Sequence, residues 1–208
     1  MIPWDGKRLL PGDDDQIDDY PGLATWWRQA EEIWNAHRSS DRLTLLDQID
    51  YRRKLSQQFP AAAQRVVYSA SGMYLAAARV SDPSAVIEHS LYWAAASGID
   101  EARYLTAILN SDTLTQLVRP LQARGEHNPR HFDKYIFQLP IPLYDPGNPE
   151  HQQLAELAKH AEEAAAAVEL PDVSFQAQRR RIREALSRDG VGGEINNLTT
   201  TLLAAAHR

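Results

Sequence analysis

The chain has 208 residues and no cysteine, so disulfide bonds and thiolate metal sites are excluded. The lack of cysteine also fits a reducing compartment. No apolar run approaches the roughly 18 residues that a membrane-spanning helix needs. The first residues lack the basic and then apolar pattern of a signal peptide. We therefore expect a cytoplasmic protein.

Catalytic motifs are scarce as well. The only clustered glycines lie at residues 190–193 between two expected helices, which is typical of a connector rather than of a cofactor-binding loop. No Gly-x-Ser-x-Gly nucleophile motif occurs. His127 and His131 are four residues apart, but a proline separates them and no cysteine or carboxylate pattern completes a metal site. Glu126 and Asp133 lie nearby and keep a metal site as the alternative to a polar loop.

Net charge is −6, which by itself argues against a nucleic-acid partner. The charge is unevenly distributed, however. Residues 1–50 carry 5 basic and 11 acidic side chains, residues 51–134 carry 10 and 7, and residues 135–208 carry 7 and 10. Because phosphate contact needs only a local positive face, the middle third can still bind DNA.

Periodicity and capping residues predict an α+β fold with a small mixed sheet and a C-terminal helical segment. Helices are expected at residues 20–38, 41–58, 100–109, 113–123, 149–169 and 174–190, with a last one ending near 206, strands at 64–69, 73–80 and 85–95, and an extended segment at 136–142. We expect three parts: an irregular acidic segment at residues 1–19, an α+β domain at 20–147 and the helical segment at 148–208. The acidic run at residues 13–19 is interpreted as a solvated loop.

The first helix contains three tryptophans, Trp26, Trp27 and Trp34, at helical spacing. They are interpreted as core or interface residues, with base stacking as the alternative. Phe175 is expected to point inward from the helix that Ser174 caps.

One short stretch is rich in planar hydrogen-bond donors. It contains Arg124, His127, Asn128, Arg130, His131 and Lys134. Arginine can bind guanine with two hydrogen bonds and asparagine can do the same with adenine, while lysine can hold phosphates. The alternative is an ordinary solvated loop. This stretch is therefore the first candidate for a DNA contact.

Further candidates are Arg52, Arg53 and Lys54, which either follow a DNA backbone or form a solvated helix face. Ser69 and Ser71 lie beside an expected hairpin turn, and that hairpin either enters a groove or is ordinary surface structure. A third basic run holds Arg179, Arg180, Arg181 and Arg183. We interpret it first as a solvated or ion-paired face and second as a phosphate contact.

Three motifs follow one another in the middle of the chain. They are Tyr-Leu-Thr-Ala-Ile-Leu-Asn-Ser at residues 104–111, a basic turn within 124–134, and Gln-Leu-Pro-Ile-Pro-Leu-Tyr-Asp-Pro at 138–146. In this order they resemble the target-recognition domains of bacterial restriction-modification adenine DNA methyltransferases. The likeness is greatest to the C-terminal specificity region of enzymes that fuse methylation to restriction. It extends over most of residues 20–170.

The resemblance implies sequence-specific recognition of double-stranded DNA for a methyltransferase or restriction-modification complex. It also implies that the catalytic domain or subunit is a separate partner, which binds S-adenosylmethionine and flips the target adenine out of the duplex. This chain departs from the full-length pattern, because it has no Pro-Pro pair and no glycine-rich cofactor motif of the methyltransferase core. It is therefore expected not to be catalytic alone.

A helical protein-interaction or scaffold subunit is the alternative function. The heptad-like helix at residues 149–169, the tryptophan-rich first helix and the acidic net charge all suit it. A homodimer through the C-terminal helices is part of this alternative.

Overall fold

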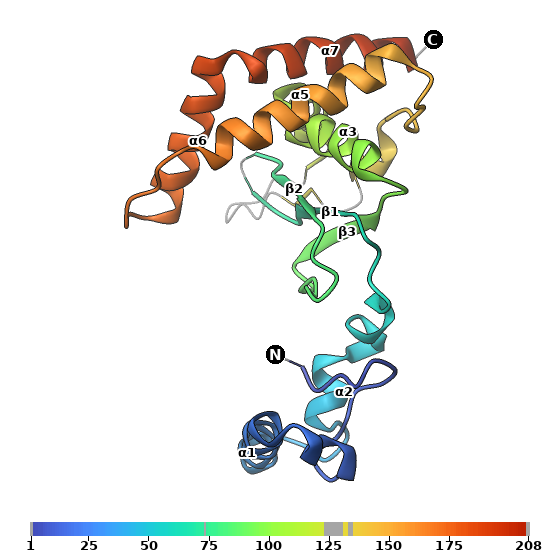
Figure 1. Ribbon diagram of the computed structural model, residues 1–208, viewed down its shortest axis with the longest axis vertical. Coiled ribbons are helices and arrows are strands. Elements are labelled where there is room, and N and C mark those ends of the chain that lie inside the picture. Colours follow the sequence, from blue (N-terminus) through green and yellow to red (C-terminus); the bar gives the residue numbers. More distant parts are fainter. Residues whose placement is uncertain (1, 73, 123–130, 133–134, 207–208) are drawn as a thin grey trace. The chain divides into compact units, whose positions relative to one another are not determined.

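The computed structural model describes residues 2–72, 74–122, 131–132 and 135–206 (Figure 1). These residues form an α+β fold with a three-stranded antiparallel sheet, which confirms the predicted fold class. The chain divides into two compact units. The N-terminal unit comprises Met1–Ala62 and Pro83–His89, and the sheet unit comprises Ala63–Asp82 and Ser90–Arg208. Among the described residues, no helix is long and apolar enough to cross a membrane.

The N-terminal unit is built on one long helix. It contains η1 (Asp15–Asp19), α1 (Pro21–His37), α2 (Leu45–Ile49), η2 (Tyr51–Arg53) and η3 (Ser56–Gln58). Its small core consists of Leu10, Ile17, Ala24 and Trp27. Trp27 is thus a core residue as expected, whereas the Trp26 side chain is 47% exposed.

The helix expected at residues 41–58 is wrong. α2 starts only after Thr44. The Thr44 side chain accepts a hydrogen bond from the Asp47 N–H, and the Asp47 carboxylate accepts one from the Thr44 N–H. This reciprocal capping box fixes the helix start locally. α2 ends at Ile49, and no helix continues to residue 58, because Arg52 and Arg53 adopt positive φ angles of 57° and 60°, which a continuous α-helix does not tolerate.

The acidic run carries short-range structure rather than an irregular loop alone. Asp14 caps η1 through the Gln16 N–H and accepts a hydrogen bond from Arg8 at 2.5 Å. Asp18 pairs with Arg28 of α1 at 2.7 Å. These bonds lower the pKa of both aspartates, with the backbone bond from Gln16 the largest cause for Asp14 and the Arg28 bond the largest for Asp18.

The sheet has the order β2-β1-β3. β1 (Arg65–Ser69) is central and pairs antiparallel with β2 (Ala77–Val80) and β3 (Leu91–Ala95). Both outer strands are shorter than the expected 73–80 and 85–95. β3 is shorter because Gln58 binds the segment before it. The Gln58 amide donates to the Ile87 carbonyl and accepts a hydrogen bond from the Ile87 N–H, each at 2.8 Å.

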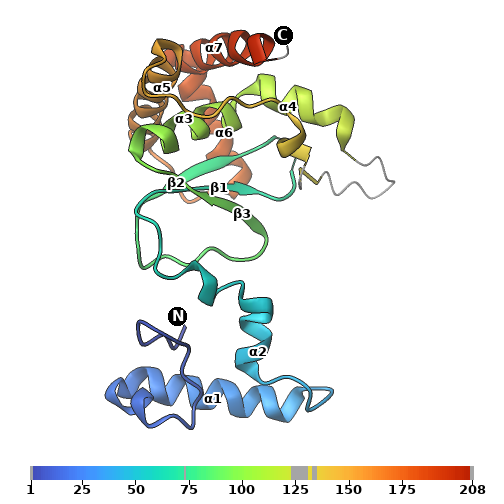
Figure 2. The ribbon, with the colours of Figure 1, turned by 90° about the vertical axis from the view of Figure 1, so that its right-hand side faces the viewer.

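Helices cover one side of the sheet in layers (Figures 1 and 2). The sheet unit contains α3 (Ile99–Asn110), α4 (Asp112–Val118), η4 (Arg119–Leu121), η5 (Tyr135–Gln138), α5 (Pro149–Ala166), α6 (Phe175–Asp189) and α7 (Val191–Ala206). Alternate residues Val66 and Tyr68 of β1 share one core with α3, α5 and α7. This core joins β1 and α3 to the C-terminal helices α5 and α7. The compact units therefore have different limits from the expected segments 1–19, 20–147 and 148–208.

Helix ends with clear local signals are confirmed. Asn148 caps α5 with Pro149 at its first position, Ser174 caps α6, and Gly190 ends α6 with a φ of 94°. Other expectations are wrong. α3 is preceded by Gly98 rather than capped by Asp100, residues 136–138 of the expected extended segment 136–142 belong to the 3-10 helix η5, and Phe175 is 69% exposed rather than inward.

Candidate nucleic-acid interface

The end of the β1–β2 hairpin meets the end of the predicted basic stretch. Ser71 forms an isolated antiparallel bridge with His131, and the next residue, Phe132, donates its N–H to the Ala70 carbonyl at 2.8 Å. Phe132 is fully buried, whereas Ser71 and His131 are exposed. The structure therefore brings two predicted site residues together on one exposed edge, and Ser69 ends the adjoining strand.

The other predicted site residues are placed differently. Arg124, His127, Asn128, Arg130 and Lys134 lie outside the described residues.

Arg52, Arg53 and Lys54 belong to the N-terminal unit, not to the sheet unit that holds the hairpin. All three are exposed, and the Arg52 guanidinium lies 5.3 Å from the ring centroid of Tyr51. They form a short basic turn of their own.

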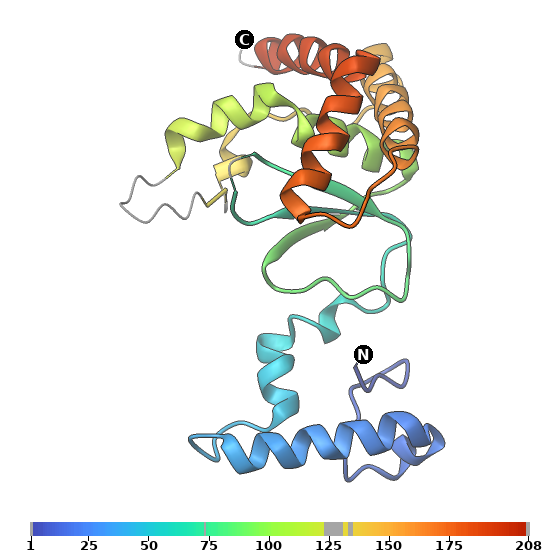
Figure 3. The ribbon, with the colours of Figure 1, turned by 90° about the vertical axis from the view of Figure 1, so that its left-hand side faces the viewer.

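A second cluster lies near the hairpin, and no sequence pattern predicts it. The guanidinium carbons of Arg119 and Arg183 lie 5.7 Å and 5.1 Å from the ring centroid of Tyr74. We call these three residues the Tyr74–arginine cluster. Tyr74 comes from the β1–β2 connection, Arg119 from η4 and Arg183 from α6, which leads into α7 (Figure 3). All three side chains are exposed.

Buried neighbours hold each member of this cluster in place. Leu75 is buried and donates its N–H to Thr115 Oγ1 at 3.4 Å, which fixes the chain directly after Tyr74. Arg119 follows Val118, which is fully buried. Arg183 lies one turn before Leu186, which packs against the main core. The cluster is therefore supported by the core rather than by surface contacts alone.

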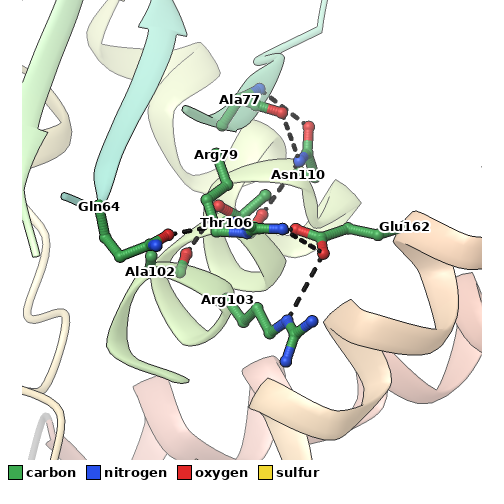
Figure 4. A network of polar contacts seen from close by, with 8 residues as sticks. All are labelled: Gln64, Ala77, Arg79, Ala102, Arg103, Thr106, Asn110 and Glu162. Carbon is green, nitrogen blue, oxygen red and sulfur yellow. Dashed lines mark hydrogen bonds and ion pairs between the residues drawn. The ribbon is translucent and has the colours of Figure 1, made fainter. Parts of the chain in front are cut away.

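The start of β2 is anchored by a side-chain amide from α3. Asn110 accepts the Ala77 N–H through Oδ1 at 3.0 Å and donates through Nδ2 to the Ala77 carbonyl at 2.9 Å (Figure 4). Nδ2 also donates to the Thr106 carbonyl at 3.0 Å. Asn110 therefore substitutes for a neighbouring strand at the point where the hairpin returns to the sheet.

An ion-pair network ties β2 to the helices beyond it. Glu162 of α5 accepts two bonds from Arg79 of β2, at 2.9 Å and 3.0 Å, and a weaker one from Arg103 of α3 at 3.5 Å (Figure 4). Partial burial alone raises the pKa of Glu162, but the bonds and charges of the two arginines outweigh it and hold that pKa below its ordinary value. The bond with Glu162 raises the pKa of Arg79. This network stabilises the contact between β2 and the helices and is not part of the candidate interface.

The motif at residues 104–111 also has a structural role. The buried Tyr104 donates its hydroxyl to the Pro142 carbonyl at 3.0 Å, and burial raises its pKa to about 12. Its ring packs 4.7 Å from the ring of His151, whose Nδ1 accepts the Asp145 N–H at 3.0 Å. Ser111 caps α4 through the Leu114 N–H. These residues position the chain on either side of the candidate interface but do not form it.

A groove between α5 and α6 is the other feature that could hold a ligand. It is lined by Ala164 of α5, by Ala167 and Val168 directly after that helix, and by Arg180, Arg181 and Arg188 of α6, together with Glu169, Glu184 and Asp189. Arg180 lies 3.8 Å from Glu184, and Asp189 lies 3.2 Å from His160. Its charges are thus partly paired internally. Within the described ranges, no three histidine or acidic side chains come together as metal ligands.

Comparison with family models, with curated proteins and with solved structures gives no match. The candidate interface is therefore argued from its own sequence and geometry.

Proposed function

We propose that this chain recognises double-stranded DNA in a sequence-specific manner, as the non-catalytic target-recognition module of an adenine DNA methyltransferase or restriction-modification complex. S-adenosylmethionine and the methyl transfer belong to the partner catalytic domain in this proposal. The observation that carries it is the bridge between Ser71 and His131, because it joins the exposed hairpin end to a predicted DNA-contact residue of the basic stretch. Hydroxyl and imidazole groups on one exposed edge are suited to base edges.

The basic third of the sequence supports the same proposal. The hairpin, the stretch from Arg124 to Lys134 and Arg119 all fall in residues 51–134, the only third with more basic than acidic side chains. Recognition requires phosphate contacts for register and base contacts for specificity, and the two kinds are expected from different residues. We propose that Ser69, Ser71, His127, Asn128 and His131 contact base edges and that the lysines and arginines contact phosphates.

A selection experiment tests this function. The purified chain is incubated at low salt with a randomised duplex pool, and the retained DNA is sequenced. We expect enrichment of a motif that contains an adenine. In the Ser71→Ala/His131→Ala double variant, preference for that motif over a scrambled duplex should fall about tenfold, since one good base contact contributes ~1–3 kcal/mol.

The variant and its control are matched to the structure. The Ser71–His131 bridge is made by backbone atoms, so alanine leaves it intact. Lys159→Ala removes a half-exposed cation from α5 and should leave the preference unchanged. Failure of the wild-type chain to retain any duplex would contradict the proposed function.

A helical interaction subunit is the second candidate, and one observation favours it. Trp26 and Ile33 of α1 are 47% and 55% exposed and lie on the same helix face, two turns apart. Large exposed apolar side chains in a row are typical of a contact surface. The two candidates differ in salt dependence, because DNA binding weakens steeply as counterions compete, whereas an apolar helix contact hardly responds.

A further inference from the structure

We propose that the Tyr74–arginine cluster is a phosphate clamp, in which Arg119 and Arg183 bind the DNA backbone independently of sequence and Tyr74 positions them. This inference rests on the proposed function and adds to it a site that contacts no base. It also separates two tasks in space, with Ser71 and His131 contacting bases and the cluster contacting phosphates.

The charges of the cluster make it a site for an anion. The guanidinium carbons lie 5.7 Å and 5.1 Å from the centroid of one ring, so the two like charges are no more than about 11 Å apart. No described carboxylate lies within ion-pair distance of either group. Like charges that are held together repel each other, and a bound phosphate relieves the repulsion. Arginine also presents a planar fork of donors that matches phosphate oxygens.

Tyr74 has a positioning role in this clamp. An aromatic ring attracts cations to its face and so limits the conformations of two long, exposed side chains. Arginines that are already oriented lose less conformational entropy when they bind a phosphate. Tyr74 is itself 41% exposed, while the next residue, Leu75, is buried.

The same pattern continues along α6. Arg179 lies one helical turn before Arg183 on the same helix face, and its guanidinium lies 5.5 Å from the ring centroid of Phe175, which is 69% exposed. Arginine and aromatic side chains therefore continue from Arg119 and Tyr74 along α6. Such a row is suited to following a nucleic-acid backbone.

Arginines on α6 divide between two faces, and this supplies a matched control. Arg180 and Arg188 line the groove against α5, where Arg180 lies near Glu184 and Arg188 donates to the Glu184 carbonyl. Removal of Arg180 changes the net charge as much as removal of Arg183 does. Only Arg183 belongs to the clamp, so charge and position can be tested separately.

The test measures the affinity of the full chain for an enriched duplex and for a scrambled duplex of equal length, at several salt concentrations. For Arg119→Ala/Arg183→Ala we expect a loss of about tenfold for each arginine, equal for both duplexes. The slope of log affinity against log salt should become shallower by about 0.9 for each lost phosphate contact. Arg119→Lys/Arg183→Lys should keep the slope and lose part of the affinity, and Tyr74→Leu should weaken binding where Tyr74→Phe does not.

Each outcome has a separate meaning. A wild-type chain that binds neither duplex overturns the proposed function and the clamp with it. Wild-type binding with unchanged affinity and slope in the double alanine variant overturns the clamp alone. A loss confined to the enriched duplex would mean that the cluster contacts bases, which also overturns the clamp, as would an equal loss in Arg180→Ala. Circular dichroism of each variant confirms that it is folded, as expected for exposed positions.

Discussion

Replacement of Glu162 by glutamine should destabilise the sheet unit selectively. Glu162 receives three contacts, two from Arg79 and one from Arg103, and the side chains involved are 29%, 19% and 16% exposed in that order. Glutamine is nearly isosteric but is neutral, and its amide group places donors against a guanidinium that also donates. Arg79 would therefore lose half of its paired contact and all of its charge neutralisation.

The expected magnitude lies between two limits. An exposed ion pair contributes ~0–1 kcal/mol, and breaking a fully buried pair costs ~3–5 kcal/mol. Since these side chains are between one-sixth and one-third exposed, we expect a loss of about 2 kcal/mol in the free energy of unfolding. For a unit of this size, that corresponds to a fall in Tm of ~4–8 °C.

Acid should remove the difference between the two proteins. The pKa of Glu162 is lower in the folded chain than its ordinary value. Its contribution to stability is therefore complete above the ordinary glutamate pKa of ~4.3 and is lost as the pH falls through the lower, folded value. Glutamine does not titrate. The gap in unfolding free energy should thus be full at neutral pH and should close in strong acid.

Denaturant unfolding followed by circular dichroism measures the gap, and hydrogen exchange assigns it to β2 and α3. Glu163→Gln is the control, because Glu163 is the neighbouring residue of α5 and is exposed. A gap below about 0.5 kcal/mol at neutral pH, or one of the same size in strong acid, would refute the reasoning.

Two further substitutions test the supports of the interface. Asn110→Ala removes three hydrogen bonds and leaves both backbone groups of Ala77 without that partner, so we expect a loss of ~2–3 kcal/mol and faster hydrogen exchange in β2. Unchanged exchange in β2 would show that Asn110 is dispensable. Tyr104→Phe removes one hydrogen bond to Pro142 and should cost about 1 kcal/mol, measured by denaturant unfolding. The tyrosine contribution is complete below its ordinary pKa of ~10. It should disappear as the pH rises through about 12, because the pKa of Tyr104 is raised in the folded chain.

Local chemistry explains which parts of the fold the sequence could predict. The ends at Asn148, Ser174 and Gly190 were predictable because a capping side chain or a glycine at positive φ acts on its own neighbours. β1 was predictable from its consecutive apolar residues Val66, Val67 and Tyr68. The actual structure of residues 41–58 was not predictable, because the composition favours one helix there while the backbone conformation of Arg52 and Arg53 interrupts it.

Long-range contacts explain the rest. Residues 85–90 have the composition of a strand, but Gln58 binds Ile87 and holds that segment outside the sheet. The Tyr74–arginine cluster combines residues from three distant segments, so no spacing rule can find it. Arg183 differs from Arg180 only in the direction that its side chain takes from α6, and that direction depends on how α6 packs.

The chain passes between its two compact units at three points, after Ala62, Asp82 and His89. Neither unit can therefore be excised with a single cut. Deletion of residues 1–62 would leave Pro83–His89 in the connection between β2 and β3 without the rest of its unit. Ile87 would then lose both hydrogen bonds to the Gln58 amide. Recombination with a single crossover after Ala62 would separate Gln58 from Ile87 in the same way, so exchange of the N-terminal unit must carry residues 83–89 together with residues 1–62.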